Sequence, residues 1–264
     1  MRLAVDKPRV ARAFSRGAAA YDDHARVQAH VIERLIALAL PCAPAPRRVL
    51  DVGAGTGALL SLLAARLPGA ALTAVDLAEG MARAARARTR RGEAAVGDAE
   101  ALPFRDGAFE LVVSTSVLQW LPRLEPAFAE ARRALATGGL FAVALFAGAT
   151  LAELRGAWRD AAPEACDRTH RFHAMEDVAS ALATAGLEAL FVEREIVIER
   201  HADVPSLLRA LRRIGANGNA TPAGAGLGGR RALERMMRLY DARHRSDDGI
   251  PATWEIVYAL ARRR

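Results

Sequence analysis

Short apolar runs alternate with segments of helical periodicity through the middle of the chain. Strands are predicted for the β-prone apolar runs at Val49–Leu50, 71–75, 93–96, 109–114 and Leu140–Phe146. Helix-periodic segments lie between them, at 57–66, 79–89 and about Glu125–Leu135. The pair Gly138-Gly139 follows the last helix as a stop signal, and the almost wholly apolar final strand is typical of one buried on both faces. This alternation predicts an α/β protein with an open, mostly parallel sheet and helices on both faces.

The residues before the first strand predict an N-terminal helical cap over 1–46. A helix from about Asp22 to Leu40 carries its apolar residues on one face, and Gly17 separates a shorter helix upstream. Pro41 and the prolines that follow it end the cap. Because it precedes the sheet, we expect the cap to cover a ligand pocket.

The second half of the chain is less regular and predicts an insertion before the last strand. The elements expected here are helices at 150–161, 175–185, 204–213 and 229–241 and strands at 188–198 and 253–261. The glycine-rich stretch Gly215–Gly229 should be loop. So long a connection is unusual for a hairpin, so it is our candidate for a substrate lid, together with the cap. The expected organisation is one structural domain with a cap (1–46), a core (47–200), a helical lid insertion (201–250) and a last core strand (251–264).

Composition narrows the class of protein. With 264 residues, 52% of them hydrophobic, the chain can bury a full core as one domain. No apolar run approaches the ~20 residues needed to span a bilayer, and the N-terminus lacks the apolar segment of a signal peptide, so we expect a cytoplasmic protein without a membrane partner. Cys42 and Cys166 lie far apart and show no metal-type spacing, so we interpret them as structural thiols and expect no metal site.

The net charge of +7 raises the question of an acidic partner. All basic residues except Lys7 are arginine, which together with abundant alanine suggests a GC-rich coding bias. The arginines are spread along the chain, and no run alternates basic with aromatic residues. We therefore expect no nucleic-acid binding, whereas an acidic protein partner remains compatible with the charge.

The glycine turn at the first strand carries the main chemical signal. The stretch Arg47–Gly57, RRVLDVGAGTG, leads from a strand through three glycines into an apolar helix. No lysine follows, so it is not a P-loop, and its GxGxG spacing has Ala58 where a dinucleotide fold would place a third glycine. Asp51 stands at the strand end, where its carboxylate can meet a cationic amino group. The pattern resembles motif I of the Rossmann-like class I S-adenosylmethionine methyltransferases.

Two further acidic residues end strands in the same order. Asp76 ends the second strand, where these folds hold the ribose hydroxyls of an adenosine; a solvated strand-end aspartate is the alternative. Asp98, in the stretch GDAEALPF, resembles the family's loop whose aspartate accepts the adenine amino group. The resemblance implies S-adenosyl-L-methionine as cofactor and S-adenosyl-L-homocysteine as product. The implied cofactor-binding residues are Tyr21, Asp51, Gly53, Ala54, Gly55, Asp76, Leu77, Met81, Asp98, Ala99 and Ser114.

Segments outside the glycine motif resemble one family in particular. DKxxVARAFSRGAAAYDDHARVQ, SVLQWL, GATLAELRGAW, LRRIGAN and the closing IPATWEIVYALA are similar to the malonyl-[acyl-carrier protein] O-methyltransferases, nearly end to end. This resemblance implies methylation of the malonyl carboxylate on acyl carrier protein, in the pathway that makes the pimeloyl part of biotin. Thr137 stands where methyltransferases usually have a proline, and the glycine-rich loop after Ala216 identifies no substrate residue.

The implied reaction needs no general base. A malonyl carboxylate has a pKa near the ~3.5 of an ordinary carboxyl, so it is ionised at neutral pH. The histidines, His24, His30, His170, His173, His201 and His244, are mostly expected to be solvated, and we expect no catalytic side chain beyond those that align and desolvate the reactants. The substrate-binding candidates are Gln28, Trp120, Arg155 and Arg171, the arginines for their bidentate geometry. Tyr21 closes over the methionine end of the cofactor in similar enzymes; packing of the cap is the alternative.

Three other functions remain open at this stage. A methyltransferase for another small carboxylic acid, of the aconitate type, or for another small molecule would share every cofactor residue. A nicotinamide-dependent oxidoreductase is opposed by the glycine spacing. A purely binding role is compatible with the missing acid or base, and the oligomeric state cannot be inferred from the sequence.

Overall fold

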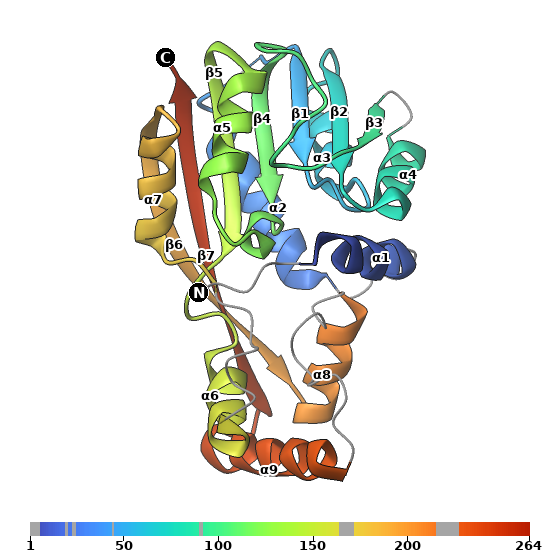
Figure 1. Cartoon of the computed structure of the whole chain (residues 1–264), viewed down its shortest axis with the longest axis vertical. Helices are drawn as coiled ribbons and strands as arrows, with labels where there is room; N and C mark the ends of the chain where they lie inside the picture. Colours follow the sequence, from blue (N-terminus) through green and yellow to red (C-terminus); the bar gives the residue numbers. More distant parts are fainter. Residues whose placement is uncertain are drawn as a thin grey trace.

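The computed structural model describes residues 6–18, 21–22, 25–43, 45–89, 92–163, 172–214 and 227–264. Within them, seven strands form one sheet in the order β3-β2-β1-β4-β5-β7-β6 (Figure 1). The strands are β1 (Arg48–Val52), β2 (Ala71–Asp76), β3 (Glu93–Val96), β4 (Phe109–Thr115), β5 (Leu135–Phe146), β6 (Leu187–His201) and β7 (Ile250–Arg263). The first five are parallel, and β7 lies antiparallel between β5 and β6. The predicted open, mostly parallel sheet is confirmed.

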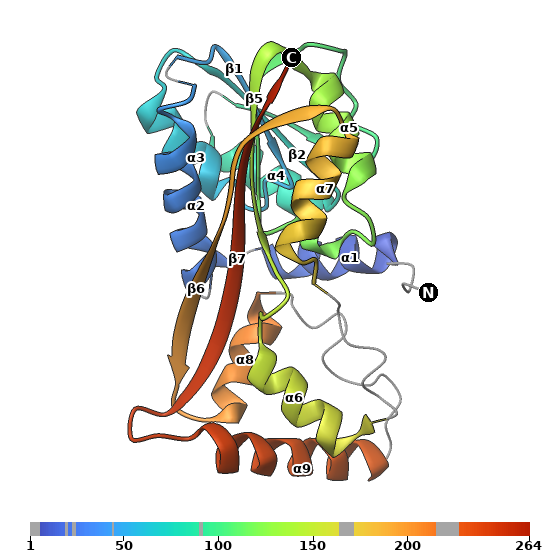
Figure 2. The same ribbon diagram turned by 90° about the vertical axis from the view of Figure 1, so that its left-hand side faces the viewer.

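Helices cover both faces of this sheet, as the alternating pattern predicts. The helices are α1 (Lys7–Gly17), α2 (Arg26–Ala39), α3 (Ala58–Arg66), α4 (Glu79–Arg88), α5 (Glu125–Ala134), α6 (Ala152–Ala161), α7 (Met175–Thr184), α8 (Val204–Arg213) and α9 (Leu227–His244), with a short 3₁₀ turn, η3 (Leu118–Trp120). One apolar cluster joins α2 and α3 to one face, through residues such as Leu35 and Leu60. A second cluster joins α5 and α7 to the other face, through Phe128 and Leu182 (Figure 2).

The last two strands are long and extend beyond the rest of the sheet. Helices α6, α8 and α9 gather around their far ends, below α1 in Figure 1. The first apolar cluster continues into these helices through Trp158, Leu207, Met236 and Tyr240, so the lower part shares a core with the sheet. Within the described residues, no helix combines the length and hydropathy that a membrane span requires.

Several element boundaries differ from the prediction. The pair Gly138-Gly139 does not stop a helix: α5 ends at Ala134 and β5 already begins at Leu135. The pairing of β4 with β5 shifts between Phe109/Leu135 and Leu111/Leu140, and Gly138 has a φ of 78°. The glycines therefore form a bulge inside the strand. From the sequence alone, a glycine pair that forms a bulge looks the same as one that ends a helix.

Strands β6 and β7 are both longer than predicted, and the segment between them connects His201 to Ile250. Residues 227–229, expected in the glycine-rich loop, are helical. The remainder of that loop, residues 215–226, lies outside the described residues. Helix α2 begins at Arg26 rather than near Asp22.

Candidate functional site

The glycine turn after β1 forms the floor of the site. The N–H groups of Gly53 and Ala54 donate to the carbonyl of Val75, at 2.7 and 3.1 Å, which ties the turn to β2. Gly57 has a φ of 81° and starts α3, and a Cβ on it would lie 2.9 Å from the Cα of Ala85 in α4. Only glycine allows this left-handed conformation and close approach together, so the third glycine of the motif serves helix packing.

Asp76, at the end of β2, is fixed by two backbone groups. Its carboxylate accepts hydrogen bonds from the N–H of Gly55 at 2.9 Å and from the N–H of Ala78 at 2.8 Å. Burial raises the pKa of Asp76, and these two hydrogen bonds act in the opposite direction. The predicted ribose-binding carboxylate thus also holds the glycine turn in shape.

Asp51 is fully buried next to the turn, and its side chain has no hydrogen-bond partner. Its exposed fraction is 1%, and neither carboxylate oxygen meets a donor among the described residues. Burial, and then the charge of Asp76, raise the pKa of Asp51 to about 8. A buried carboxylate without a partner is costly, and an ammonium group would relieve the cost. Asp51 does not itself line the pocket, but it directly precedes Val52, which does.

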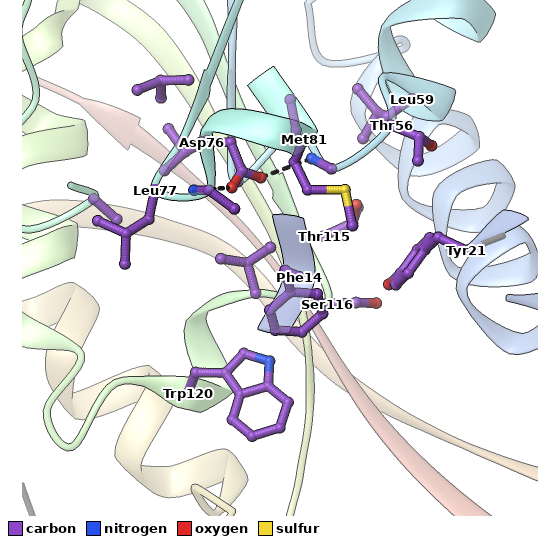
Figure 3. A pocket seen from close by; sticks show the side chains of 18 of the residues that line it. Phe14, Tyr21, Thr56, Leu59, Asp76, Leu77, Met81, Thr115, Ser116 and Trp120 are labelled. Atoms are coloured by element: carbon purple, nitrogen blue, oxygen red, sulfur yellow. Dashed lines mark hydrogen bonds between the residues drawn. The ribbon is translucent and has the colours of Figure 1, made fainter. Parts of the chain in front are cut away.

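A cavity of about 340 Å³ opens at the carboxyl ends of the parallel strands. Most of the predicted residues line it: Tyr21, Gln28, Gly53, Ala54, Gly55, Asp76, Leu77, Met81, Asp98, Ala99 and Trp120. Figure 3 shows Asp76, Leu77 and Met81 on one part of the wall, with Phe14, Ser116, Trp120 and Tyr21 around another. The cavity therefore offers carboxylates along one wall and aromatic rings along the other.

Helix α1 covers this cavity with one face. Lys7, Val10, Ala11 and Phe14 all line the cavity, and their spacing of three, one and three places them on one side of a helix. The Lys7 ammonium contacts Asp98 at 2.6 Å and also pairs with Glu100. The cap thus reaches the predicted adenine end of the site through the single lysine of the chain.

Three aromatic side chains meet where the cap lies over the cavity. The ring of Phe14 lies 6.4 Å from that of Tyr21 and 6.0 Å, edge-on, from that of Trp120. Burial raises the pKa of the Tyr21 hydroxyl, and the charges of Asp76 and Asp22 add to the rise, so the group is a neutral donor. Tyr21 lines the cavity and also packs the cap onto the core, whereas its closure over the methionine end of the cofactor stays a prediction.

Besides Asp51, three predicted site residues are not placed in the cavity wall. Ser114 is fully buried and donates to the carbonyl of Val52 at 2.8 Å, so it joins two strands; its neighbours Thr115 and Ser116 line the cavity instead. The guanidinium of Arg155 in α6 lies 5.8 Å from the ring centre of Phe172 and is not part of the lining. Arg171 lies outside the described residues.

Other lining residues were missed. The helical spacing of the residues on the cavity side of α1 can be recognised in the sequence. It does not indicate which part of the protein that side of the helix covers. The ion pair of Asp22 with Arg88, and the 2.6 Å hydrogen bond from Thr56 to Asp22, join segments far apart in sequence and have no local signal. None of the described histidines lines the cavity, and His173 is buried against the carbonyl of Leu121 rather than solvated as expected. The described residues contain no cluster of three or more side chains suited to a metal ion.

Comparison with known proteins identifies the family. Residues 50–143 match the family described as "Methyltransferase domain". The chain is 53% identical to a malonyl-[acyl-carrier protein] O-methyltransferase of Geobacter sulfurreducens, over 98% of this chain and 100% of that protein. The protein of that name from Laribacter hongkongensis is 38% identical over 97% of this chain and 89% of its own length. The chain belongs to the malonyl-[acyl-carrier protein] O-methyltransferase family.

Membership in this O-methyltransferase family makes the chain an S-adenosylmethionine-dependent methyltransferase. Another relative, a "Biotin biosynthesis bifunctional protein" of Cellvibrio japonicus, is 36% identical over 97% of this chain and 50% of that protein. Among solved structures, the YcgJ protein of Bacillus gives a TM-score of 0.63 at 16% identity, covering 88% of this chain and 99% of that one. A geranyl diphosphate methyltransferase in complex with its cofactor gives 0.56 at 17% identity, covering 90% and 86%. These structures share the Rossmann-like class I fold.

Proposed function

We propose that the chain transfers a methyl group from S-adenosylmethionine to the free carboxylate of malonyl-acyl carrier protein. The malonyl methyl ester so formed would start the synthesis of the pimeloyl part of biotin. The relation to malonyl-[acyl-carrier protein] O-methyltransferases over nearly the whole chain carries this proposal. It is supported by a cavity with Asp76 and Asp98 in its wall and the buried Asp51 beside it, three carboxylates that suit the cofactor.

The cofactor, when bound, supplies a methyl group activated by a sulfonium: a carboxylate oxygen forms a bond to the methyl carbon while the carbon–sulfur bond breaks and its electron pair stays on sulfur. No proton is transferred, because the malonyl carboxylate is already ionised at neutral pH. The chain's contribution is therefore alignment of the two reactants and exclusion of water.

Residues along the sheet edge are proposed to bind successive parts of the cofactor, and residues of the cap to exclude water. Asp98, Asp76 and Asp51 stand at the ends of β3, β2 and β1, in the order in which an adenine, a ribose and an amino-acid group follow one another. The orphaned carboxylate of Asp51 suits the ammonium of the amino-acid part. Above them, Phe14 and Tyr21 of the cap cover the cavity and exclude water from the reacting groups.

Arginine-rich surfaces suit an acidic carrier protein. The sequence points to Arg209, Arg212 and Arg213 in α8 and to a face of α9, where Arg231, Arg235 and Arg238 are exposed and form no ion pair with the described residues. The structure adds a nearer surface, since α1 exposes three arginines of its own on the side away from the cavity.

These α1 arginines are Arg9, Arg12 and Arg16, spaced by three and four residues on one helical face. They form no ion pair with the described residues. The carbonyl of Arg213 in α8 lies 4.0 Å from a Cβ built on Gly17, so the basic ends of the two helices adjoin. We therefore place the carrier on α1 and the end of α8, beside the cavity, and keep the 201–250 insertion as the proposed lid.

The proposal is tested by comparing acceptors at fixed cofactor concentration. Formation of S-adenosylhomocysteine should be fastest with malonyl-acyl carrier protein, slower with malonyl-coenzyme A and slowest with free malonate or aconitate. A preference for a free acid would assign the chain to the alternative, a small-acid methyltransferase. No product with any of these acids, despite cofactor binding by calorimetry, would contradict carboxyl methylation.

A further inference from the structure

The described wall of the cavity contains no cation that is free to hold a carboxylate. Its two cationic side chains are Lys7 and Arg88, and both are already in ion pairs, with Asp98 and Glu100 and with Asp22. A carboxylate that entered the cavity would have to displace one of these pairs or use other donors. The arrangement directs attention to neutral hydrogen-bond donors in the wall.

Ser116, directly after β4, presents such a donor in a strained conformation. Its φ is 57°, in the left-handed region that a residue with a Cβ rarely adopts because it is strained there. Its backbone is held there from both sides: its N–H donates to the carbonyl of Ala144 at 2.8 Å, and its carbonyl accepts from Nε2 of the buried Gln119 at 2.7 Å.

The hydroxyl that this conformation presents has no partner. The Oγ of Ser116 is buried and forms no hydrogen bond with any described residue. Two other residues of the cavity wall, Thr115 and Tyr21, also carry hydroxyls. Figure 3 shows Ser116 and Tyr21 directed into the same part of the cavity, close to Phe14. Strain, burial and an unused donor together are the features of a ligand-binding position.

The place of Ser116 in the sheet indicates which ligand it meets. The sheet order is β3-β2-β1-β4, so Ser116 follows the strand next to the glycine turn, one step beyond the three aspartates. Trp120 and Phe14 complete this end of the cavity. The acceptor must approach here, since the aspartates already occupy the side suited to the nucleoside and the amino-acid group.

We propose that the Ser116 hydroxyl, with those of Thr115 and Tyr21, binds the carboxylate that is methylated. The inference rests on the proposed function and specifies its acceptor subsite. Neutral hydroxyls hold the carboxylate through one oxygen and leave its charge in place, so the attacking oxygen stays negative. A bidentate arginine would instead bind both oxygens and neutralise the carboxylate. The positive charge that faces the acceptor is then that of the sulfonium.

The test uses the whole chain, four serine variants and, for the competing assignment to an arginine, Arg155→Ala and Arg171→Ala. Ser116→Ala removes the hydroxyl and Ser116→Gly removes both hydroxyl and strain, whereas Ser116→Asn keeps a donor on a residue that tolerates a positive φ. Ser61→Ala, on α3 and outside the cavity wall, is the control for loss of a serine hydroxyl. The kinetic constants for malonyl-acyl carrier protein and malonyl-coenzyme A, and the dissociation constant of S-adenosylhomocysteine, are measured for each.

We expect kcat/KM to fall about tenfold or more, for both acceptors, in the alanine and glycine variants, as for one hydrogen bond to a charged group. Ser116→Asn should recover part of the loss, and the affinity for S-adenosylhomocysteine should not change. A loss of cofactor affinity instead would assign Ser116 to the cofactor, and unchanged kinetics would overturn the inference. A loss confined to Arg155→Ala or Arg171→Ala would return the carboxylate to an arginine. An inactive wild-type enzyme would contradict the proposed function itself. The results for the variants test only the role of Ser116 and leave the proposed function in place.

Discussion

At the scale of single residues, Asp76 joins the glycine turn to the wall of the cavity. The same carboxylate accepts from Gly55 and Ala78 and faces the cavity. Its position at the end of β2 was predictable, because a strand followed by an acidic residue has a local signal. Its hydrogen bond to the Gly55 N–H could not be predicted from the sequence, because that contact joins two segments that are apart in the chain.

We predict that Asp76→Ala weakens cofactor binding by more than tenfold. The ribose hydroxyls lose a charge-assisted acceptor, which is worth roughly 1.5–3 kcal/mol, and the glycine turn loses a hydrogen bond. Calorimetric titration with S-adenosylhomocysteine measures the effect, and Asp248→Ala, at an exposed carboxylate, is the control. Unchanged affinity in the folded variant would remove Asp76 from the site.

Asp51 predicts a dependence of cofactor binding on pH. Since its pKa in the free protein is about 8, the carboxyl is mostly protonated at pH 7 and must lose its proton to pair with an ammonium. Binding of S-adenosylhomocysteine at pH 7 should therefore release protons, which calorimetry in buffers of different ionisation enthalpy detects. Asp51→Asn should abolish the release. Equal apparent enthalpies in all buffers for the wild type would contradict this account.

The same raised pKa has a consequence for the stability of the free protein. Because the folded state binds this proton more tightly than the unfolded state, the stabilisation is complete below the unfolded pKa of about 4 and is lost as pH rises through about 8. The Tm of the free protein should fall over this range, and Asp51→Asn should flatten the fall. A Tm that falls equally in both proteins would place its cause elsewhere.

At the scale of the elements, helix α1 decides how the cavity is closed. It has no fully buried residue, and it is held by Lys7 at one end and by a close contact with α4. A Cβ on Gly80 of α4 would lie 2.7 Å from the carbonyl oxygen of Ser15, and the Gly80 N–H donates to the Ser15 hydroxyl at 3.2 Å. The contact between these helices therefore requires glycine.

We predict that Gly80→Ala displaces α1 and weakens cofactor binding severalfold. In a helix, glycine to alanine ordinarily stabilises by about 1 kcal/mol, so a loss of binding here would come from the contact with Ser15. Gly156→Ala in α6 is the matched control, since no atom lies within 4 Å of the Cβ position. It should raise Tm slightly and leave binding unchanged. Equal behaviour of the two variants would show that α1 does not close the site.

The elements also show where prediction from sequence succeeds. Strands and helices from β1 to β4 were predicted within about two residues, because each combines a clear period with a turn signal. The Gly138-Gly139 bulge and the lengths of β6 and β7 were not, since pairing across the sheet determines them. Ser114 was named from the family resemblance, but the alternation of side chains along β4 turns it away from the cavity.

At the scale of the whole molecule, the net charge of +7 is relevant only where it gathers on one surface. We predict that Arg12→Glu with Arg16→Glu in α1 raises the KM for malonyl-acyl carrier protein and leaves that for malonyl-coenzyme A nearly unchanged. The effect should shrink as salt rises, because exposed charges are screened over ~10 Å at 0.1 M. Arg235→Glu with Arg238→Glu in α9 is the matched pair.

The comparison of the two pairs locates the carrier. A larger effect of the α9 pair would move the docking surface to the lid. Equal losses for both acceptors would mean that the variants had damaged the cavity rather than a docking surface. No effect of either pair would place the carrier elsewhere on the molecule.

The central claim, methylation of a carrier-bound malonyl carboxylate, is tested most directly by mass spectrometry of the acceptor. Malonyl-acyl carrier protein is incubated with the enzyme and S-adenosylmethionine, and the phosphopantetheine arm is then fragmented. The account predicts a gain of one methyl group, located on the malonyl carboxylate and removed by mild ester hydrolysis. An unmodified acceptor, or a methyl group on the carrier polypeptide itself, would contradict it.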